Sequence, residues 1–275
     1  MTQNLNHSHI GIFDSGVGGL SVLRAIRAQL PDVPVIYLGD QVHVPYGPRS
    51  LEEVRDFSEE ITRFLLSRGA KLIVVACNTA SAAALEHLRR TFPEVPFVGM
   101  EPAVKPAAEQ TKSGVVGVLA TPATFQGALY ASVVERFAQG VTVLQDTCPG
   151  LVAQIEKGAL EAPETESILR AALLPMLEKH IDTVVLGCTH YPFVIPLIER
   201  IAGESVRVID PAPAVARQTG RLFVSRGLRS AARANESVTV YTTAAADSMK
   251  NLLPLLLGEP GAVRELRWVN GKLTE

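Results

Sequence analysis

Residues 74–79 read VVACNT, and residues 185–189 read VLGCT. Each stretch is an apolar run of the kind that forms a buried strand, and each leads into a cysteine, Cys77 or Cys188, with a threonine close behind it. In open α/β sheets, ligands bind beyond the carboxyl ends of the strands. The two stretches therefore predict two similar strands that each bring a thiol to a ligand-binding edge.

Two further pairs of segments repeat in the same order along the chain. GIFDS, which begins at Gly11, matches GVLAT, which begins at Gly117. The pair Glu101-Pro102 matches Asp210-Pro211 at a similar separation. Similar features in one order at nearly one offset predict two related halves, and two thiols at equivalent edges of those halves would face each other across a crevice.

Short β-branched runs alternate with helix-like stretches along the whole chain, which indicates βαβ units. We therefore expect an α/β fold of two pseudo-symmetric domains, each a mostly parallel sheet flanked by helices, with the active site in the cleft between them. The first domain is expected to contain residues 1–100 plus 211–275, and the second residues 101–210. The expected strands, all apolar and buried, are 10–13, 35–38, 72–76, 115–119, 141–144, 184–186, 206–209 and 238–241.

Two helices have clear sequence signals. Ser50 is expected to cap the first, with Glu53 reaching back to complete a capping box, and this helix should stop near Gly69. Apolar residues at a spacing of four predict the second, which should end before Gly140. Its apolar face contains Phe125, Leu129, Val133 and Phe137.

Composition limits the class of protein. The chain has 275 residues, of which 47% are hydrophobic and 20% charged, so it can bury a core and disorder is excluded. Its 26 basic and 28 acidic residues nearly cancel, so binding to nucleic acid or to an anionic membrane is not expected. Residues 1–9 are polar and no apolar run could span a bilayer, which favours the cytoplasm.

Cytoplasmic thiols stay reduced, so the three cysteines must serve packing or chemistry. Cys148 has no counterpart in the repeat, and we interpret it as structural. Facing Cys77 and Cys188 could form a redox disulfide, bind a metal, or exchange protons on opposite faces of one carbon. The chain has neither a Cys-x-x-Cys motif nor a local group of four metal ligands, so proton exchange without metal or cofactor is favoured.

Asp14 and His190 are candidate helpers, because each follows a predicted strand at the edge where a thiol is expected. The glycine-rich segment that starts at Gly16 is close to a dinucleotide fingerprint, with Asp40 where a ribose-binding acid would lie, but Ser21 replaces the third glycine. A carboxylate at Asp14 would also repel a pyrophosphate. A nicotinamide enzyme stays open as an alternative, although the glycines better suit a smaller anion such as a substrate carboxylate.

Four motifs together resemble those of bacterial glutamate racemases, in order and at the spacing of that family. They are DSGVGG from Asp14, PYG from Pro45, ACNTA from Ala76 and GCTHYP from Gly187. The family belongs to the cofactor-independent aspartate/glutamate racemases, which have two pseudo-symmetric α/β domains and supply D-glutamate for peptidoglycan. The resemblance covers about residues 10–270.

The resemblance implies roles for individual residues. Cys77 would exchange a proton with D-glutamate and Cys188 with L-glutamate, assisted by Asp14 and His190 respectively. Glu156, in a stretch that starts with Cys148-Pro149, is implied as a further site residue, although Gly150 and Ala153 depart from the family pattern there. The residues implied to hold substrate are Ser15, Tyr46, Gly47, Asn78, Thr79, Thr189 and Glu156.

Other functions stay open at this stage. Aspartate racemases of the superfamily tend to carry glutamate after the second Cys-Thr, whereas this chain has His190, so glutamate is favoured over aspartate or another small acidic amino acid. The resemblance also leaves open a homodimer and a protein that binds DNA gyrase with a secondary racemase site.

Overall fold

The structure is a computed structural model and describes residues 8–228 and 238–275. The strands are β1 (His9–Asp14), β2 (Val35–Gly39), β3 (Ala70–Val75), β4 (Phe97–Val98), β5 (Val115–Ala120), β6 (Thr142–Asp146), β7 (Thr183–Gly187), β8 (Arg207–Ile209), β9 (Val238–Thr242), β10 (Val263–Glu265), β11 (Arg267–Val269) and β12 (Lys272–Thr274). The helices are α1 (Leu20–Gln29), α2 (Leu51–Ser67), α3 (Asn78–Thr91), α4 (Val104–Gln110), α5 (Pro122–Gln126), α6 (Ala128–Phe137), α7 (Leu151–Glu156), α8 (Pro163–Leu177), η1 (Tyr191–Val194), α9 (Ile195–Ala202), α10 (Ala212–Ser225) and α11 (Ala246–Leu256).

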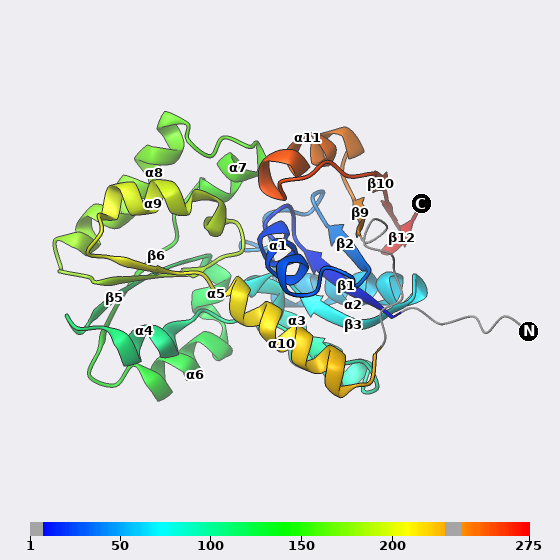
Figure 1. Cartoon of the computed structure of the whole chain (residues 1–275), viewed down its shortest axis with the longest axis horizontal. Helices are drawn as coiled ribbons and strands as arrows, with labels where there is room; N and C mark the ends of the chain where they lie inside the picture. Colours follow the sequence, from blue (N-terminus) through cyan, green and yellow to red (C-terminus); the bar gives the residue numbers. More distant parts are fainter. Residues whose placement is uncertain (1–7, 229–237) are drawn as a thin grey trace, which may run out of the picture.

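Two parallel sheets with helices on their faces form the molecule (Figure 1). The first sheet has the strand order β10-β9-β2-β1-β3-β4, and the second has the order β6-β5-β7-β8. Strands β11 and β12 form a separate antiparallel hairpin. The prediction of an α/β fold with a mostly parallel sheet in each half is confirmed.

The strand orders explain the repeated motifs of the sequence. The order β2-β1-β3-β4 in one sheet recurs as β6-β5-β7-β8 in the other, so each strand has a counterpart four strands later. The strands that precede Cys77 and Cys188, β3 and β7, both lie beside the central strand of their sheet. The two thiols therefore leave equivalent edges of two sheets with the same topology.

The C-terminal part of the chain returns to the first sheet. Strand β9 pairs with β2, and β10 extends the same edge. Helix α10 leaves the second sheet and packs against α1, as Figure 1 shows below the centre of the molecule. Residues far apart in sequence thereby complete the sheet that ends at Asp14 and Cys77.

Local signals account for α2 but not for the second predicted helix. The Ser50 side chain accepts from the Glu53 backbone, and the Glu53 side chain accepts from the Ser50 backbone, so the predicted capping box is confirmed. The helix predicted across Phe125 to Phe137 is wrong in one respect. Gly127 is extended, with φ −70° and ψ 136°, and it divides the segment into α5 and α6, so that Phe125 lies in a different helix from the rest of the face.

Two of the predicted strands are also less buried than expected. Strands β5 and β7 are buried almost throughout, whereas β6 and β8 are partly exposed. The physical reason is their position, because β6 and β8 are the edge strands of the second sheet. Within residues 8–228 and 238–275, none of the helices combines the length and apolar character needed to cross a membrane.

Candidate functional site

Both strand-end thiols open into one small cavity between the two sheets. Cys77 and Cys188 are buried, with 5% and 6% of their surfaces exposed, and both line this cavity. Its volume is about 20 Å³, which is close to the space that a single water needs. The site is therefore closed in this conformation, and an amino acid can enter only if parts of the wall separate.

Cys77 lies at the N-terminus of a helix. It is the N-cap of α3, and its Sγ accepts a hydrogen bond from Ala80 N at 3.4 Å. Burial raises the pKa of the Cys77 thiol, and the charge of Asp14 raises it further. This thiol is therefore protonated in the resting site.

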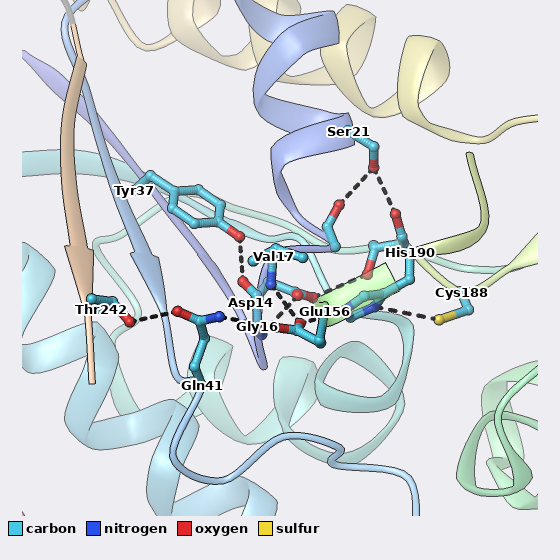
Figure 2. A network of polar contacts seen from close by, with 12 residues as sticks. Asp14, Gly16, Val17, Ser21, Tyr37, Gln41, Glu156, Cys188, His190 and Thr242 are labelled. Atoms are coloured by element: carbon cyan, nitrogen blue, oxygen red, sulfur yellow. Dashed lines mark hydrogen bonds and ion pairs between the residues drawn. The ribbon is translucent and has the colours of Figure 1, made fainter. Parts of the chain in front are cut away.

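Cys188 is followed by a turn that brings a histidine against it. His190 Nδ1 lies 3.7 Å from Cys188 Sγ, and His190 Nε2 lies 2.7 Å from Glu156 Oε1 (Figure 2). Burial alone would lower the pKa of His190, but its contacts with Cys188 and Glu156 outweigh burial and hold this pKa well above its usual value. Cys188 thus faces an imidazolium.

Glu156 is held as a carboxylate by three hydrogen-bond donors. Besides His190, Val17 N donates to Oε1 at 2.8 Å and Gln41 Nε2 donates to Oε2 at 2.9 Å. Burial would raise the pKa of Glu156, but the hydrogen bonds from His190, Val17 and Gln41 outweigh burial and lower it. An ionised carboxylate only accepts, so the Nε2 of His190 carries a proton.

Asp14 is fully buried between the two cysteine motifs. Its Oδ2 accepts from Gly16 N at 2.9 Å, and its Oδ1 accepts from Thr189 Oγ1 at 3.1 Å. Burial raises the pKa of Asp14, and the nearby charge of His190 and the Gly16 N–H offset this only in part. Asp14 acts on Cys77 through its charge, while its hydrogen bond reaches the residue next to Cys188.

The glycine-rich segment after β1 makes room for the second half of the molecule. A Cβ at Gly16 would collide with the Glu156 carboxylate, and a Cβ at Gly18 would collide with His190. The anion that meets the backbone N–H groups is therefore a carboxylate of the protein itself, through Val17 N. The expectation that this segment also approaches the carboxylate of a substrate stays a prediction.

Asp40 organises the loop that carries Tyr46. Its two oxygens accept from Tyr46 Oη at 2.7 Å, Thr243 Oγ1 at 2.8 Å and Trp268 Nε1 at 2.8 Å, and His43 Nδ1 lies at 2.9 Å. These contacts occupy the carboxylate that the dinucleotide interpretation assigned to a ribose. They also occupy the Tyr46 hydroxyl, so only its ring and backbone are free to face the cavity.

The cavity gathers most of the site residues predicted from the sequence. Its lining includes Ser15, Tyr46, Gly47, Cys77, Asn78, Thr79, Cys188, Thr189 and His190. Asp14 and Glu156 lie behind this lining, where they contact Thr189 and His190. Both polar atoms of the buried Asn78 side chain lack a partner among the described residues, whereas buried amides are normally paired with protein, water or a ligand.

Sequence reasoning missed Thr121 and Gln41. Thr121 lines the cavity, and its Oγ1 lies 2.9 Å from Thr79 Oγ1 across the two halves. The internal repeat held the signal, because Thr121 is the counterpart of Ser15. Gln41 contacts Glu156 from 115 positions away, and no local pattern marks it.

A larger cavity, of about 700 Å³, lies where the chain passes between the two sheets. The repeated pairs Glu101-Pro102 and Asp210-Pro211 both line it, whereas neither thiol does. The larger cavity is therefore formed by the segments that connect the two halves, whereas both thiols line the small closed cavity.

Two parallel α/β halves with one thiol from each facing a closed cavity are the arrangement that was expected from the sequence for an enzyme that moves a proton between two faces of a carbon. A family model for Asp/Glu/hydantoin racemases matches residues 11–219. The chain belongs to this racemase family. The family assignment made from the sequence motifs is thus confirmed, and the nicotinamide alternative has no support from these matches.

Individual relatives agree with the family. The chain is 52% identical to a glutamate racemase of Roseiflexus sp. (strain RS-1), over 89% of this chain and 90% of the relative. Among solved structures it is similar to a glutamate racemase of Bacillus anthracis, with a TM-score of 0.83 and 35% identity over 94% and 97% of the two chains. A glutamate racemase of Escherichia coli, solved with L-glutamate bound, gives a TM-score of 0.83 and 34% identity over the same shares.

Proposed function

We propose that this chain interconverts L- and D-glutamate by proton transfer to and from two thiols, without a metal or an organic cofactor. The observation that carries the proposal is the shared cavity of Cys77 and Cys188, in which one thiol is protonated and the other faces an imidazolium. One group is thus set to donate a proton while the other is set to accept one.

In the direction from L to D, the Cys188 thiolate takes the α-proton of L-glutamate. The Cys77 thiol then gives its proton to the opposite face of the α-carbon, which yields D-glutamate and leaves Cys77 as the thiolate. The reverse reaction starts from that second protonation state, and exchange with water restores the first. His190 stabilises the thiolate of Cys188, and Asp14 is proposed to assist Cys77.

Small polar groups around the cavity suit the carboxylates and the amine of the substrate. We assign substrate binding to the side chains of Ser15, Asn78, Thr79 and Thr189 and to the backbone of Tyr46 and Gly47. The unpartnered Asn78 amide is the strongest support for this assignment. Glu156 is assigned instead to His190, because its two oxygens already accept three hydrogen bonds from the protein.

Entry of glutamate requires the halves to separate. Contacts that cross between them include Ser21 Oγ to Thr189 O at 2.9 Å and Thr79 Oγ1 to Thr121 Oγ1 at 2.9 Å. We propose that these two hydrogen bonds break when the site opens. The two domains that move apart are those predicted from the repeat, residues 1–100 plus 211–275 and residues 101–210.

The proposed product is D-glutamate for peptidoglycan synthesis in the cytoplasm. Glutamate is favoured over aspartate by the names of the relatives and by His190 after the second Cys-Thr. A homodimer and an interaction with DNA gyrase stay predictions from the resemblance. Light scattering tests the first, and a supercoiling assay of gyrase with added protein tests the second.

A chiral assay tests the proposed function. Purified protein should convert L-glutamate to the racemate and D-glutamate to the same mixture, with L-aspartate turned over far more slowly. Activity should survive a chelator and hydroxylamine, because the thiols perform both transfers. Faster turnover of aspartate would contradict the substrate, and activity that returns only on adding metal or pyridoxal phosphate would contradict the cofactor-free chemistry.

A further inference from the structure

A line of hydrogen bonds joins Cys188 to the strand that the C-terminal part adds to the first sheet. From Cys188 it passes through His190 and Glu156 to Gln41, and Gln41 Oε1 accepts from Thr242 Oγ1 at 2.7 Å (Figure 2). Gln41 lies just beyond β2, and Thr242 is the fully buried last residue of β9. The half that carries Cys77 therefore contacts the acid–base group of Cys188 through a side-chain amide.

The chemistry of its neighbours fixes the orientation of the Gln41 amide. Ala244 N donates to Thr242 Oγ1 at 3.1 Å, so the hydroxyl hydrogen of Thr242 is free to go to Gln41 Oε1. Nε2 must then face the Glu156 carboxylate, because the reversed amide would place an oxygen against an anion. Gln41 thus donates to Glu156 Oε2 and leaves Oε1 of Glu156 for His190 and Val17.

From this geometry we propose that Gln41 is a positioning residue that acts through Glu156 on His190, and so first on the Cys188 face of the reaction. The inference rests on the proposed function for its catalytic consequence. Without the amide, Glu156 Oε2 has no donor among residues 8–228 and 238–275, so the carboxylate can rotate and its hydrogen bond to His190 weakens. Among the described residues, the titratable groups that face His190 are Cys188, Glu156 and Asp14, and of these three Glu156 is the one that contacts Gln41.

Gln41→Ala should lower kcat/KM for both enantiomers about tenfold, which equals about 1.4 kcal/mol. The loss must be equal in the two directions, because enantiomers have the same free energy in water. Isotope effects distinguish proton transfer at Cys188 from proton transfer at Cys77, on the opposite face of the α-carbon. Slower transfer at Cys188 should increase the kcat/KM isotope effect of α-deuterated L-glutamate and decrease that of α-deuterated D-glutamate.

Three variants separate positioning from general loosening of the loop. Thr242→Val removes the hydroxyl that aligns Gln41 and should shift the isotope effects in the same direction, by less. Thr242→Ser keeps the hydroxyl and should behave as the native chain. Val42→Ala alters the exposed neighbour of Gln41 on the same loop and should leave both rate and isotope effects unchanged.

A second measurement does not depend on turnover. In the native protein with ¹⁵N-labelled histidine, the His190 ring should remain imidazolium to a higher pH than in Gln41→Ala, because a poorly held carboxylate stabilises the cation less. If the native chain fails to racemise glutamate, the proposed function is wrong, and the titration still tests Gln41. If the chain is active but Gln41→Ala leaves both the isotope effects and the His190 titration unchanged, the positioning role is wrong.

Discussion

Cys77 and Cys188 leave equivalent strand ends of two sheets with one topology, yet their surroundings differ. Cys77 caps a helix, receives a backbone N–H from Ala80 and is affected by the charge of Asp14. Cys188 instead precedes the short 3₁₀ helix η1, and His190 in the intervening turn lies against its sulfur. The repeat supplies two thiols, and the divergence after each strand gives them different neighbours, a helix N-terminus and Asp14 at Cys77 and an imidazolium at Cys188.

The difference shows how a repeated fold can place an acid on one face of a carbon and a base on the other. A symmetric pair of environments would favour the same state in both thiols, whereas transfer needs one acid and one base. The two environments are also linked, because Asp14 of the first half accepts from Thr189 and Gln41 of the first half donates to Glu156. The first half therefore contributes to the surroundings of the thiol that the second half carries.

Among the changes that test this difference between the two thiols, removal of either thiol should have the largest effect on turnover. Cys77→Ser and Cys188→Ser should each lower turnover in both directions by about 10³-fold or more, since a serine hydroxyl is too weakly acidic to replace a thiolate. Polarimetry or circular dichroism of the glutamate measures the rate. Cys148→Ser is the matched control and should keep most activity, because Cys148 lies outside the residues that line the cavity. A wild-type rate in either strand-end variant would exclude the two-thiol mechanism.

Replacing one helper at a time tests whether each serves a single thiol. Asp14→Asn and His190→Asn should each lower kcat/KM about 10²-fold, equally for both enantiomers. Asp14→Asn should increase the isotope effect of α-deuterated D-glutamate and decrease that of the L form, and His190→Asn should do the reverse. Competitive isotope measurements give these values. Equal changes for the two enantiomers in both variants would remove the assignment of one helper to each thiol.

The pair of Glu156 and His190 should make stability depend on pH in a defined window. The folded pKa of Glu156 lies below its usual 4.5, so its contribution is lost as pH falls below that value. The folded pKa of His190 lies above its usual 6.5, so its contribution is lost as pH rises from 6.5 through the raised value. Between 4.5 and 6.5 both contributions are present.

Urea unfolding from acid to alkaline pH measures this window. Between pH 4.5 and pH 6.5, the unfolding free energy of the native chain should exceed that of His190→Asn by about 1 to 3 kcal/mol. At lower or higher pH the difference should be smaller. A difference that stays constant across the whole range would show that the pair does not titrate as described.

The sequence predicted the strands of this molecule and the residues at their ends more fully than it predicted the contacts between side chains. The strands before Cys77 and Cys188 are continuous apolar runs, so their burial and their polar edges could be inferred from residue type. Phe97–Val98 is too short a strand to give such a signal. The break at Gly127 was missed because the apolar spacing continues across it, although glycine weakens a helix there.

The polar network was harder to predict for a physical reason. A single hydrogen bond between side chains depends on how two elements are placed to within a fraction of an ångström, and local sequence does not encode that placement. The resemblance pointed to Glu156 but not to its partners, Val17 and Gln41. The glycine-rich segment was noticed as a possible anion-binding turn, whereas the structure shows that Gly16 and Gly18 provide space for Glu156 and His190.

Early turnover of L-glutamate in heavy water tests the two-thiol account most directly. The protein thiols exchange with solvent, so Cys77 should deliver deuterium to the α-carbon from the face opposite to Cys188. At low conversion, mass spectrometry of the separated enantiomers should find deuterium in nearly all of the D-glutamate and almost none in the recovered L-glutamate. Deuterium that enters both enantiomers at the same rate, or D-glutamate that retains the original α-hydrogen, would contradict transfer between two thiols.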